Sequence, residues 1–536
     1  MIPAAALASP LAPARHAVNP LWLRWWAAPI VGALGACGFA PLGLWPLTLA
    51  ALAWLIEATA RTTNWRGAAL VGWAFGVGHF SLGNNWIATA FTFQAAMPAW
   101  LGGVAVVLLS LYLALFPALA VAAARAFGGR DRAGLPLALA GSWVLGEWLR
   151  GWVCTGFPWN PIAVVALGGA DRPGLAVLAQ GIGTYALGGV IVLLAAAWRE
   201  GAWRASARCW LSAAACIAVP VAAMLAPIHG HGGEGTRAFT LVQPNRPQSE
   251  LDDPARFPAH FQRMAELSRP LAPWQRRLVL WPESGIPDYL RDGYPAWLYQ
   301  GSTFGGDPKL ARTRLGATIG PNALLLTGAE DLETRGQDVT GARNVVTAVD
   351  ESGAIRGSYA KAHLVPYGEY LPMRGLLAPL GLARLVPGAI DFVPGPGPRT
   401  LDLGPWGKVG VQVCYEIVFS GAVIDEAHRP DVLFNPSNDG WFGAWGPPQH
   451  LAQARLRAIE EGLPILRATT TGISAVIDAD GVVRATIAHG EAARIDGLVP
   501  PAHAPTLFAR LGNALALGWV VVFLCAAAIA SRRRRG

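Results

Sequence analysis

Charged residues are scarce in this chain. Only 14% of its 536 residues are Asp, Glu, Lys or Arg, whereas 53% are hydrophobic and 23 are tryptophan. Soluble globular domains carry about 25% charged residues, so this composition excludes an ordinary soluble protein and indicates a membrane protein. The net charge of +8 requires no nucleic-acid partner, because arginines at the ends of apolar segments account for much of it.

Cysteine is also rare, and most of the chain between residues 229 and 510 lacks it. The one exception is Cys414, which follows the apolar run Val409–Val413. A thiol without a partner in its own domain cannot form an intradomain disulfide, so this cysteine is a candidate nucleophile. No metal-ligand spacing joins the others, and we expect neither a metal nor a cofactor. The remaining cysteines lie in or beside apolar segments: Cys37, Cys154, Cys209, Cys216 and Cys525.

Long apolar stretches recur along the first 228 residues and once more near the end. About 20 apolar residues cross a bilayer, so these segments predict an eight-helix α-helical transmembrane bundle. The stretch between the last two has the composition and length of one soluble domain. We therefore expect a bundle at 1–228, an extracytoplasmic domain at 229–506, and a final span with a basic tail at 507–536. The expected spans are 25–41, 43–60, 68–92, 97–124, 134–151, 177–198, 209–228 and 511–530.

Arginines predict the orientation of this bundle, because basic residues in short loops stay in the cytoplasm. They fall on every second connection and end in the tail Arg532–Arg535. Both termini are then cytoplasmic, and the inserted domain lies on the outer, periplasmic face of a bacterial inner membrane. A cleaved signal peptide within residues 15–41 is the alternative for the N-terminus, but it would spoil the alternation.

Few ionisable residues lie inside the expected spans. Glu57 and Arg150 are close enough to span ends to reach water, and Glu147 has the i,i+3 spacing for an ion pair with Arg150. His79 either packs in the core or lines a cavity. Transporters usually contain more buried charge, so this scarcity disfavours transport.

The inserted domain alternates short apolar strands with helical patterns, which predicts an α/β layered fold. The turn at Asp480–Gly481 adds a hairpin, so the sheet is expected to be mixed. Helices are expected at Pro254–Ser268 and Gln449–Glu461. The expected strands are Phe239–Gln243, Arg277–Trp281, Ala323–Gly328, Asn344–Asp350, Lys408–Cys414, Val432–Asn435, Ile465–Ala468 and Ser474–Asp478.

Three chemically useful residues follow strands in this domain, where α/β enzymes place their catalytic groups. They are Glu283, Lys361 and Cys414. A carboxylate can take the thiol proton, a lysine can stabilise a tetrahedral oxyanion, and a thiolate can form a thioester. Each residue alone has an ordinary structural explanation, but the three together predict acyl transfer.

This trio resembles the Glu–Lys–Cys triad of the nitrilase superfamily of carbon–nitrogen hydrolases, which implies an αββα sandwich. More closely, the chain resembles the apolipoprotein N-acyltransferase family, both in its spans and in its motifs. One departure is the stretch 246–252, which has no aromatic residue where family members often have one. The supporting motifs are Leu241–Asn245, Pro366–Tyr370, Asn435–Phe442 and Gln449–His450.

The resemblance implies a ping-pong reaction without a cofactor. The thiolate of Cys414 would take an acyl chain from a phospholipid, and the α-amine of a diacylglyceryl-cysteine on an apolipoprotein would then accept it. Glu283 would be the general base. Lys361 and the backbone N–H of Tyr415 would bind the oxyanion.

Supporting roles are implied for two further carboxylates. Glu369 either orients Lys361 and assists the base, or braces the turn Pro366–Leu371 by an ion pair. Glu416 either supports the site from behind or is purely structural. We also expect substrate contacts from Trp441 and Phe442, in a glycine-rich loop that either anchors at the membrane, moves as a lid, or simply packs on the domain.

Two other functions stay open at this point. A membrane-anchored nitrilase-type amidase would use the same triad, although the apolar arm Leu371–Gly395 favours a lipid-facing site. A channel, transporter or scaffold with a degenerate outer domain is disfavoured by the intact triad. A monomer is the default, since no helix-association motif stands out.

Overall fold

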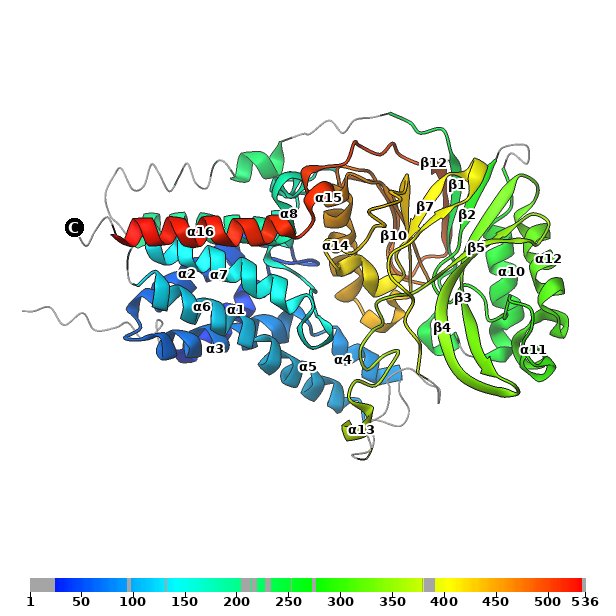
Figure 1. The fold of residues 1–536 in the computed structure, drawn as a ribbon, viewed down its shortest axis with the longest axis horizontal. Coiled ribbons are helices and arrows are strands. Elements are labelled where there is room, and N and C mark those ends of the chain that lie inside the picture. Colours follow the sequence, from blue (N-terminus) through cyan, green and yellow to red (C-terminus); the bar gives the residue numbers. More distant parts are fainter. Residues whose placement is uncertain are drawn as a thin grey trace, which may run out of the picture.

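Helices occupy one end of the molecule and two β-sheets occupy the other (Figure 1). The structure is a computed structural model. It describes residues 25–93, 98–129, 131, 133–203, 214, 218, 220–226, 233–251, 253–271, 276–377, 379 and 391–532.

The helical end is built from the N-terminal segments together with the last helix of the chain, which packs beside α7 and α8 (Figure 1). Its helices are α1 (Ala28–Ala36), α2 (Trp45–Arg61), α3 (Trp65–Gly83), α4 (Ile87–Ala90), α5 (Trp100–Leu113), α6 (Leu115–Phe127), α7 (Gly134–Arg150), α8 (Ala179–Trp203), α15 (Leu507–Leu511) and α16 (Ala514–Arg532).

Among the described residues, three helical segments are long and apolar enough to cross a membrane: Trp100–Phe127, Leu175–Glu200 and Ala514–Arg532. They coincide with three expected spans. Helices α1, α2, α3 and α7 occupy four other expected spans but do not meet both conditions, so the count of eight stays a prediction. The expected span 209–228 lies largely outside the described residues.

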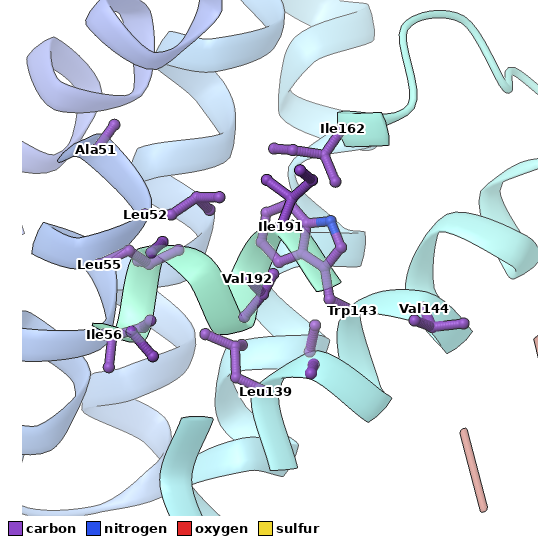
Figure 2. Close-up of a cluster of buried hydrophobic side chains, with 14 of the residues drawn as sticks. Ala51, Leu52, Leu55, Ile56, Leu139, Trp143, Val144, Ile162, Ile191 and Val192 are labelled. Carbon is purple, nitrogen blue, oxygen red and sulfur yellow. The ribbon is translucent and has the colours of Figure 1, made fainter. Parts of the chain in front are cut away.

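Apolar side chains from α2, α7 and α8 fill the centre of the helical end (Figure 2). Leu52, Leu55, Leu139 and Val192 are completely buried there. In a bilayer, such packing stabilises the bundle through van der Waals contact rather than through removal of water.

Three ionisable residues of the expected spans, Glu57, Glu147 and Arg150, have partners of opposite charge in the bundle. Arg150 lies 4.0 Å from Glu147, which confirms the expected pair. His79 lines a pocket together with Glu147 and Arg150, which agrees with the expectation that it lines a cavity. The expectation that Glu57 and Arg150 reach water was wrong, since they are only 7% and 2% exposed. Glu57 instead binds Arg199 at 2.8 Å, because a buried carboxylate needs a counter-charge.

Two six-stranded sheets make up the other end, in the orders β12-β1-β2-β3-β4-β5 and β11-β10-β9-β8-β7-β6. Each has three parallel central strands and antiparallel edges, so the expected mixed sheet is confirmed. The strands are β1 (Ala238–Gln243), β2 (Arg277–Leu280), β3 (Ala323–Arg335), β4 (Asp338–Asp350), β5 (Ile355–Ala360), β6 (Thr400–Asp402), β7 (Lys408–Val411), β8 (Val432–Ser437), β9 (Ile465–Thr469), β10 (Ser474–Ile477), β11 (Val483–Ile487) and β12 (Ala493–Leu498).

The sheets stack face to face with helices outside them (Figure 1). One outer face is covered by α10 (Phe257–Leu267), α11 (Ala296–Ser302) and α12 (Pro308–Ile319). Helix α14 (Gly446–Glu461) covers the other and separates it from the helical end. This arrangement confirms the expected αββα sandwich, and its inter-sheet core includes buried apolar residues of β1, β2, β7 and β8.

Helix α14 is fixed to the helical end by buried polar contacts. Helix α8 is broken at Gly183 (φ 78°), where a Cβ would come within 2.6 Å of Phe508. The break leaves the N–H of Thr184 without a partner in its own helix, and this N–H donates to Glu460 Oε1 over 2.6 Å. Arg457 binds Glu460 at 2.7 Å. Helix α14 therefore covers a sheet on one side and is hydrogen-bonded to the helical end on the other.

Candidate active site

The three expected catalytic residues lie at the ends of strands and come together. Glu283 follows β2, Lys361 follows β5 directly, and Cys414 follows β7. Strands β2, β5 and β7 end at one edge of the stacked sheets, where residues 53 to 131 positions apart in sequence become neighbours. All three side chains are buried, with exposures of 6%, 1% and 5% in chain order.

Lys361 lies between two carboxylates. Its Nζ donates to Glu369 Oε1 at 2.9 Å and to Glu283 Oε1 at 3.4 Å. Burial alone lowers the pKa of the Lys361 ammonium, but these two negative charges outweigh burial and raise its pKa above the usual value. Lys361 is therefore a permanent cation that can stabilise negative charge developing beside it.

Glu283 is oriented by two amide groups. Asn344 Nδ2, from the middle of β4, donates to its Oε1 over 2.7 Å, and the backbone N–H of Asn438 donates to its Oε2 over 2.8 Å. Neither asparagine was predicted as a site residue. Close to them, Gly328 in β3 has no side chain because a Cβ there would lie 2.7 Å from the Glu283 Cα. Each carboxylate oxygen of Glu283 thus accepts a hydrogen bond that fixes its position.

The expected strand Lys408–Cys414 was too long. Strand β7 ends at Val411, and Cys414 opens a 3-10 helix (Cys414–Val418). Its φ of +52° lies in the left-handed region, which costs a non-glycine residue on the order of 1–3 kcal/mol. Such strain persists only where neighbouring contacts enforce it. The turn aims a buried thiol at the edge of the sheet that also carries Glu283 and Lys361.

The charges around Cys414 keep its thiol protonated. Burial raises the pKa of this thiol well above its usual value, and the negative charge of Glu283 raises it further. Lys361 and the N–H of Asn438 oppose these effects only in part. A thiol in this state needs a base to become a nucleophile, and Glu283 is the nearby carboxylate.

Glu369 makes contacts that fit both of the alternatives that the sequence left open. Its Oε1 binds Lys361 and also accepts from Asn344 Nδ2 at 3.0 Å. Its Oε2 accepts from the N–H of Val365 at 2.8 Å, which closes the turn that contains Pro366. One carboxylate therefore orients the lysine and braces the turn.

Glu416 ties the nucleophile's turn to the segment after Lys361. Its Oε2 accepts from the N–H of Val413 at 2.7 Å, and its Oε1 accepts from the N–H of Ala362 at 2.7 Å and from Tyr359 Oη at 2.8 Å. Burial raises the pKa of Glu416 to about 7, against the opposing effect of these donors. These contacts connect Glu416 to the residues beside Cys414 and Lys361.

Tyr415 faces the helical end. Its hydroxyl donates to the carbonyl oxygen of Gly156 at 3.3 Å, and its ring lies edge-on to Phe419 with centroids 5.1 Å apart. These side-chain contacts therefore hold Tyr415 in place, and its backbone N–H lies directly after Cys414 in the chain.

The aromatic loop after β8 packs on the helical end rather than on its own domain alone. Phe442 is 9% exposed, and its ring centroid lies 4.7 Å from that of Trp86 and 5.7 Å from that of Trp159. Trp441 lies edge-on to Phe93 at 5.7 Å. These contacts place the loop between the nucleophile and the helices.

The arm Leu371–Gly395 is rooted on the site itself. The N–H of Phe392 donates to the carbonyl of Glu369 at 3.0 Å, and the N–H of Gly395 donates to the carbonyl of Lys361 at 2.8 Å. Leu376, in α13 (Arg374–Leu377), is 63% exposed. Residues 380–390, which contain most of the arm's expected leucines, lie outside the described residues.

No metal-binding group of three or more His, Cys, Asp or Glu side chains is found in the part of the chain that the structure describes. The site's own charged groups are thus one lysine and the carboxylates around it. Their arrangement suits proton transfer to and from a thiol and stabilisation of an oxyanion.

Sequence comparisons cover both ends of the molecule. Residues 31–197 match the family described as Apolipoprotein N-acyltransferase N-terminal domain, and residues 240–497 match Carbon-nitrogen hydrolase. Apolipoprotein N-acyltransferase of Rhodopseudomonas palustris is 34% identical over 523 residues, which cover 92% of each chain. The enzyme of Bradyrhizobium diazoefficiens is 35% identical over 96% of this chain and 95% of its own. That of Caulobacter vibrioides is 33% identical over 96% and 97%. The chain therefore belongs to the apolipoprotein N-acyltransferase family.

Proposed function

We propose that this enzyme moves an acyl chain from a phospholipid to the N-terminal α-amine of a diacylglyceryl-cysteine on an apolipoprotein, with Cys414 as the carrier. The observation that supports this most directly is the convergence of Cys414, Glu283 and Lys361 at one sheet edge of a protein built on apolar helices. A thioester intermediate is the reaction that this trio favours.

In the first half-reaction, Glu283 takes the proton from Cys414 Sγ and the thiolate attacks the ester carbonyl carbon. Lys361 Nζ and the N–H of Tyr415 stabilise the oxyanion of the tetrahedral intermediate. When the C–O bond breaks, Glu283 returns the proton to the departing oxygen. A lysophospholipid leaves, and the acyl group stays on sulfur.

In the second half-reaction, Glu283 takes a proton from the attacking amine nitrogen. The amine forms a C–N bond, the C–S bond breaks, and the thiol regains its proton. The first half-reaction needs Glu283 ionised because the resting thiol is protonated. The second needs it ionised because the amine must lose a proton as the C–N bond forms.

The proposed topology has the bundle at residues 1–228, the catalytic domain at 229–506 on the periplasmic side, and the last span with its tail at 507–536. Both termini are then in the cytoplasm of a bacterium, and the protein acts as a monomer. Arginines at alternate connections support this orientation. Cytoplasmic and periplasmic reporters fused after Arg532 test it, and activity of a periplasmic reporter there would contradict it.

The acyl carrier is tested with purified full-length protein and phospholipid vesicles. Intact mass should increase by one acyl chain, and peptide mapping should place that chain on Cys414. The Cys414→Ala variant should remain unmodified. Addition of a diacylglyceryl-cysteine peptide should remove the acyl group and yield a triacylated peptide. Loss of the acyl group to water at the same rate with or without peptide would favour the amidase-type reaction instead.

A further inference from the structure

A buried histidine bonds to the backbone of the nucleophile from behind. His450 Nε2, on α14, lies 3.1 Å from the carbonyl oxygen of Cys414, and the His450 side chain is completely buried. A carbonyl oxygen only accepts, so Nε2 carries the hydrogen and donates it. This contact reaches the one residue of the turn whose φ is strained, at +52°.

The other ring nitrogen meets an ion pair. His450 Nδ1 lies 3.0 Å from Asp439 Oδ1 and 3.0 Å from Arg467 Nη2. Arg467 and Asp439 bind each other at 2.6 Å, and neither side chain is exposed. If the imidazole is neutral, Nδ1 accepts from Arg467; if it is charged, Nδ1 donates to Asp439. In both protonation states Nε2 keeps its hydrogen for Cys414.

Aromatic rings restrict the imidazole on its flanks. The ring centroid of Trp159 lies 5.3 Å from that of His450, and the centroid of Phe442 lies 5.7 Å away. The imidazole is therefore fixed by a charge pair at one nitrogen and by packing around its ring. A side chain held this tightly can impose a direction on the carbonyl that it bonds.

We propose that His450 is a positioning residue: its Nε2–H fixes the carbonyl of Cys414, and Asp439 with Arg467 fixes the imidazole, so that Sγ points toward Glu283 and Lys361. Neither proton nor acyl group passes through His450. The inference rests on the proposed thioester chemistry of Cys414. A misplacement of about 1 Å can cost on the order of 100-fold in rate.

The test compares His450→Gln with His450→Phe in the full-length protein. The amide of Gln can place a donor near the position of Nε2, whereas Phe keeps a ring without a donor. Three quantities are measured: the melting temperature, the rate of thioester formation with phospholipid vesicles over a range of lipid, and the rate of Cys414 alkylation by iodoacetamide. His260→Phe is the control, because this buried histidine on α10 bonds the side chain of Glu250 and not the backbone of Cys414.

We expect His450→Phe to lower the maximal acylation rate by about 100-fold, with an apparent KM for lipid within about twofold of wild type. His450→Gln should recover to within about tenfold of wild type, since one neutral hydrogen bond is regained. The alkylation rate should follow the same order, and His260→Phe should match wild type in both rates.

Equal rates for the Gln and Phe variants, at melting temperatures close to wild type, would overturn the proposal. So would a parallel loss of maximal rate and apparent lipid affinity. If the Phe variant does not fold, His450→Asn replaces it, because its shorter amide cannot reach the Cys414 carbonyl. A wild-type protein that forms no thioester would refute the proposed function, while the alkylation rates would still decide the role of His450.

Discussion

Lys361 lies closer to Glu369 than to Glu283, with Nζ and Glu369 Oε1 2.9 Å apart. The distance from the same Nζ to Glu283 is 3.4 Å. Glu369 is therefore the closer counter-ion of Lys361, while Glu283 also accepts hydrogen bonds from Asn344 and Asn438. A buried cation between two carboxylates leaves one of them available as a base.

Glu369→Gln should slow thioester formation by about 100-fold, because Lys361 loses its closer counter-ion and is drawn onto Glu283, the proposed base. The rate is measured by intact mass after mixing with phospholipid vesicles. Glu333→Gln, which alters a more exposed pair with Arg343, should leave the rate unchanged. A rate for Glu369→Gln within twofold of wild type would contradict this account.

Asn344→Asp should be more harmful than Asn344→Ala. The Asn344 amide donates to both Glu283 and Glu369, so an aspartate there would put a third carboxylate beside two others. Like charges raise one another's pKa and destabilise the folded state. We expect a lower melting temperature and a larger loss of acylation for the Asp variant. The reverse order in either measurement would show that the amide's role is packing alone.

Alkylation of Cys414 should be slow at pH 7 and should rise about tenfold per pH unit up to at least pH 9. Only the thiolate reacts, and burial raises the pKa of this thiol well above its usual value. The thiolate fraction therefore keeps growing throughout that range. Peptide mapping after timed exposure to iodoacetamide separates Cys414 from the other cysteines. A plateau below pH 8 would mean that the resting nucleophile is already ionised.

Arg457→Met should lower the melting temperature by on the order of 10 °C, because it leaves Glu460 buried without its cation. The double variant Arg457→Met, Glu460→Met should melt closer to wild type, since replacing both members of a buried pair is tolerated better. Thermal unfolding in detergent measures both. Arg237→Met, which removes a partly exposed pair with Asp431, should change the melting temperature by less than about 2 °C. A double variant no better than the single one would argue against pairing as the cause.

The convergence of Glu283, Lys361 and Cys414 was predictable because each follows a short apolar strand, and such strands can be recognised from their composition. Asn344 was not, because it lies inside β4, where a polar residue usually faces solvent. His450 and Asp439 were quoted only as parts of family motifs. Their partnership with the Cys414 carbonyl joins α14 to the turn after β7, which no local pattern encodes.

The fold was predicted in outline, with gaps at the sheet edges. All eight predicted strands and both named helices were found, but β3 ends at Arg335 instead of Gly328 and β4 begins at Asp338 instead of Asn344. The four missed strands, β5, β6, β11 and β12, are the edge strands of the two sheets and have partly exposed residues, so their hydrophobic pattern is weak. Helix α12 was missed because its buried face contains small residues such as Ala311 and Gly316, while the apolar Leu310 is exposed, so the helical pattern is weak.

The connection through α14 has a geometrical consequence for selectivity. Helix α14 is hydrogen-bonded to both ends of the protein. In the proposed orientation, it would therefore hold Cys414 at one height above the bilayer. An ester carbonyl or an amine that travels in the membrane at another depth cannot reach the sulfur by tilting of the catalytic domain. The enzyme would then choose between lipids partly by where along the membrane normal their reactive atoms lie.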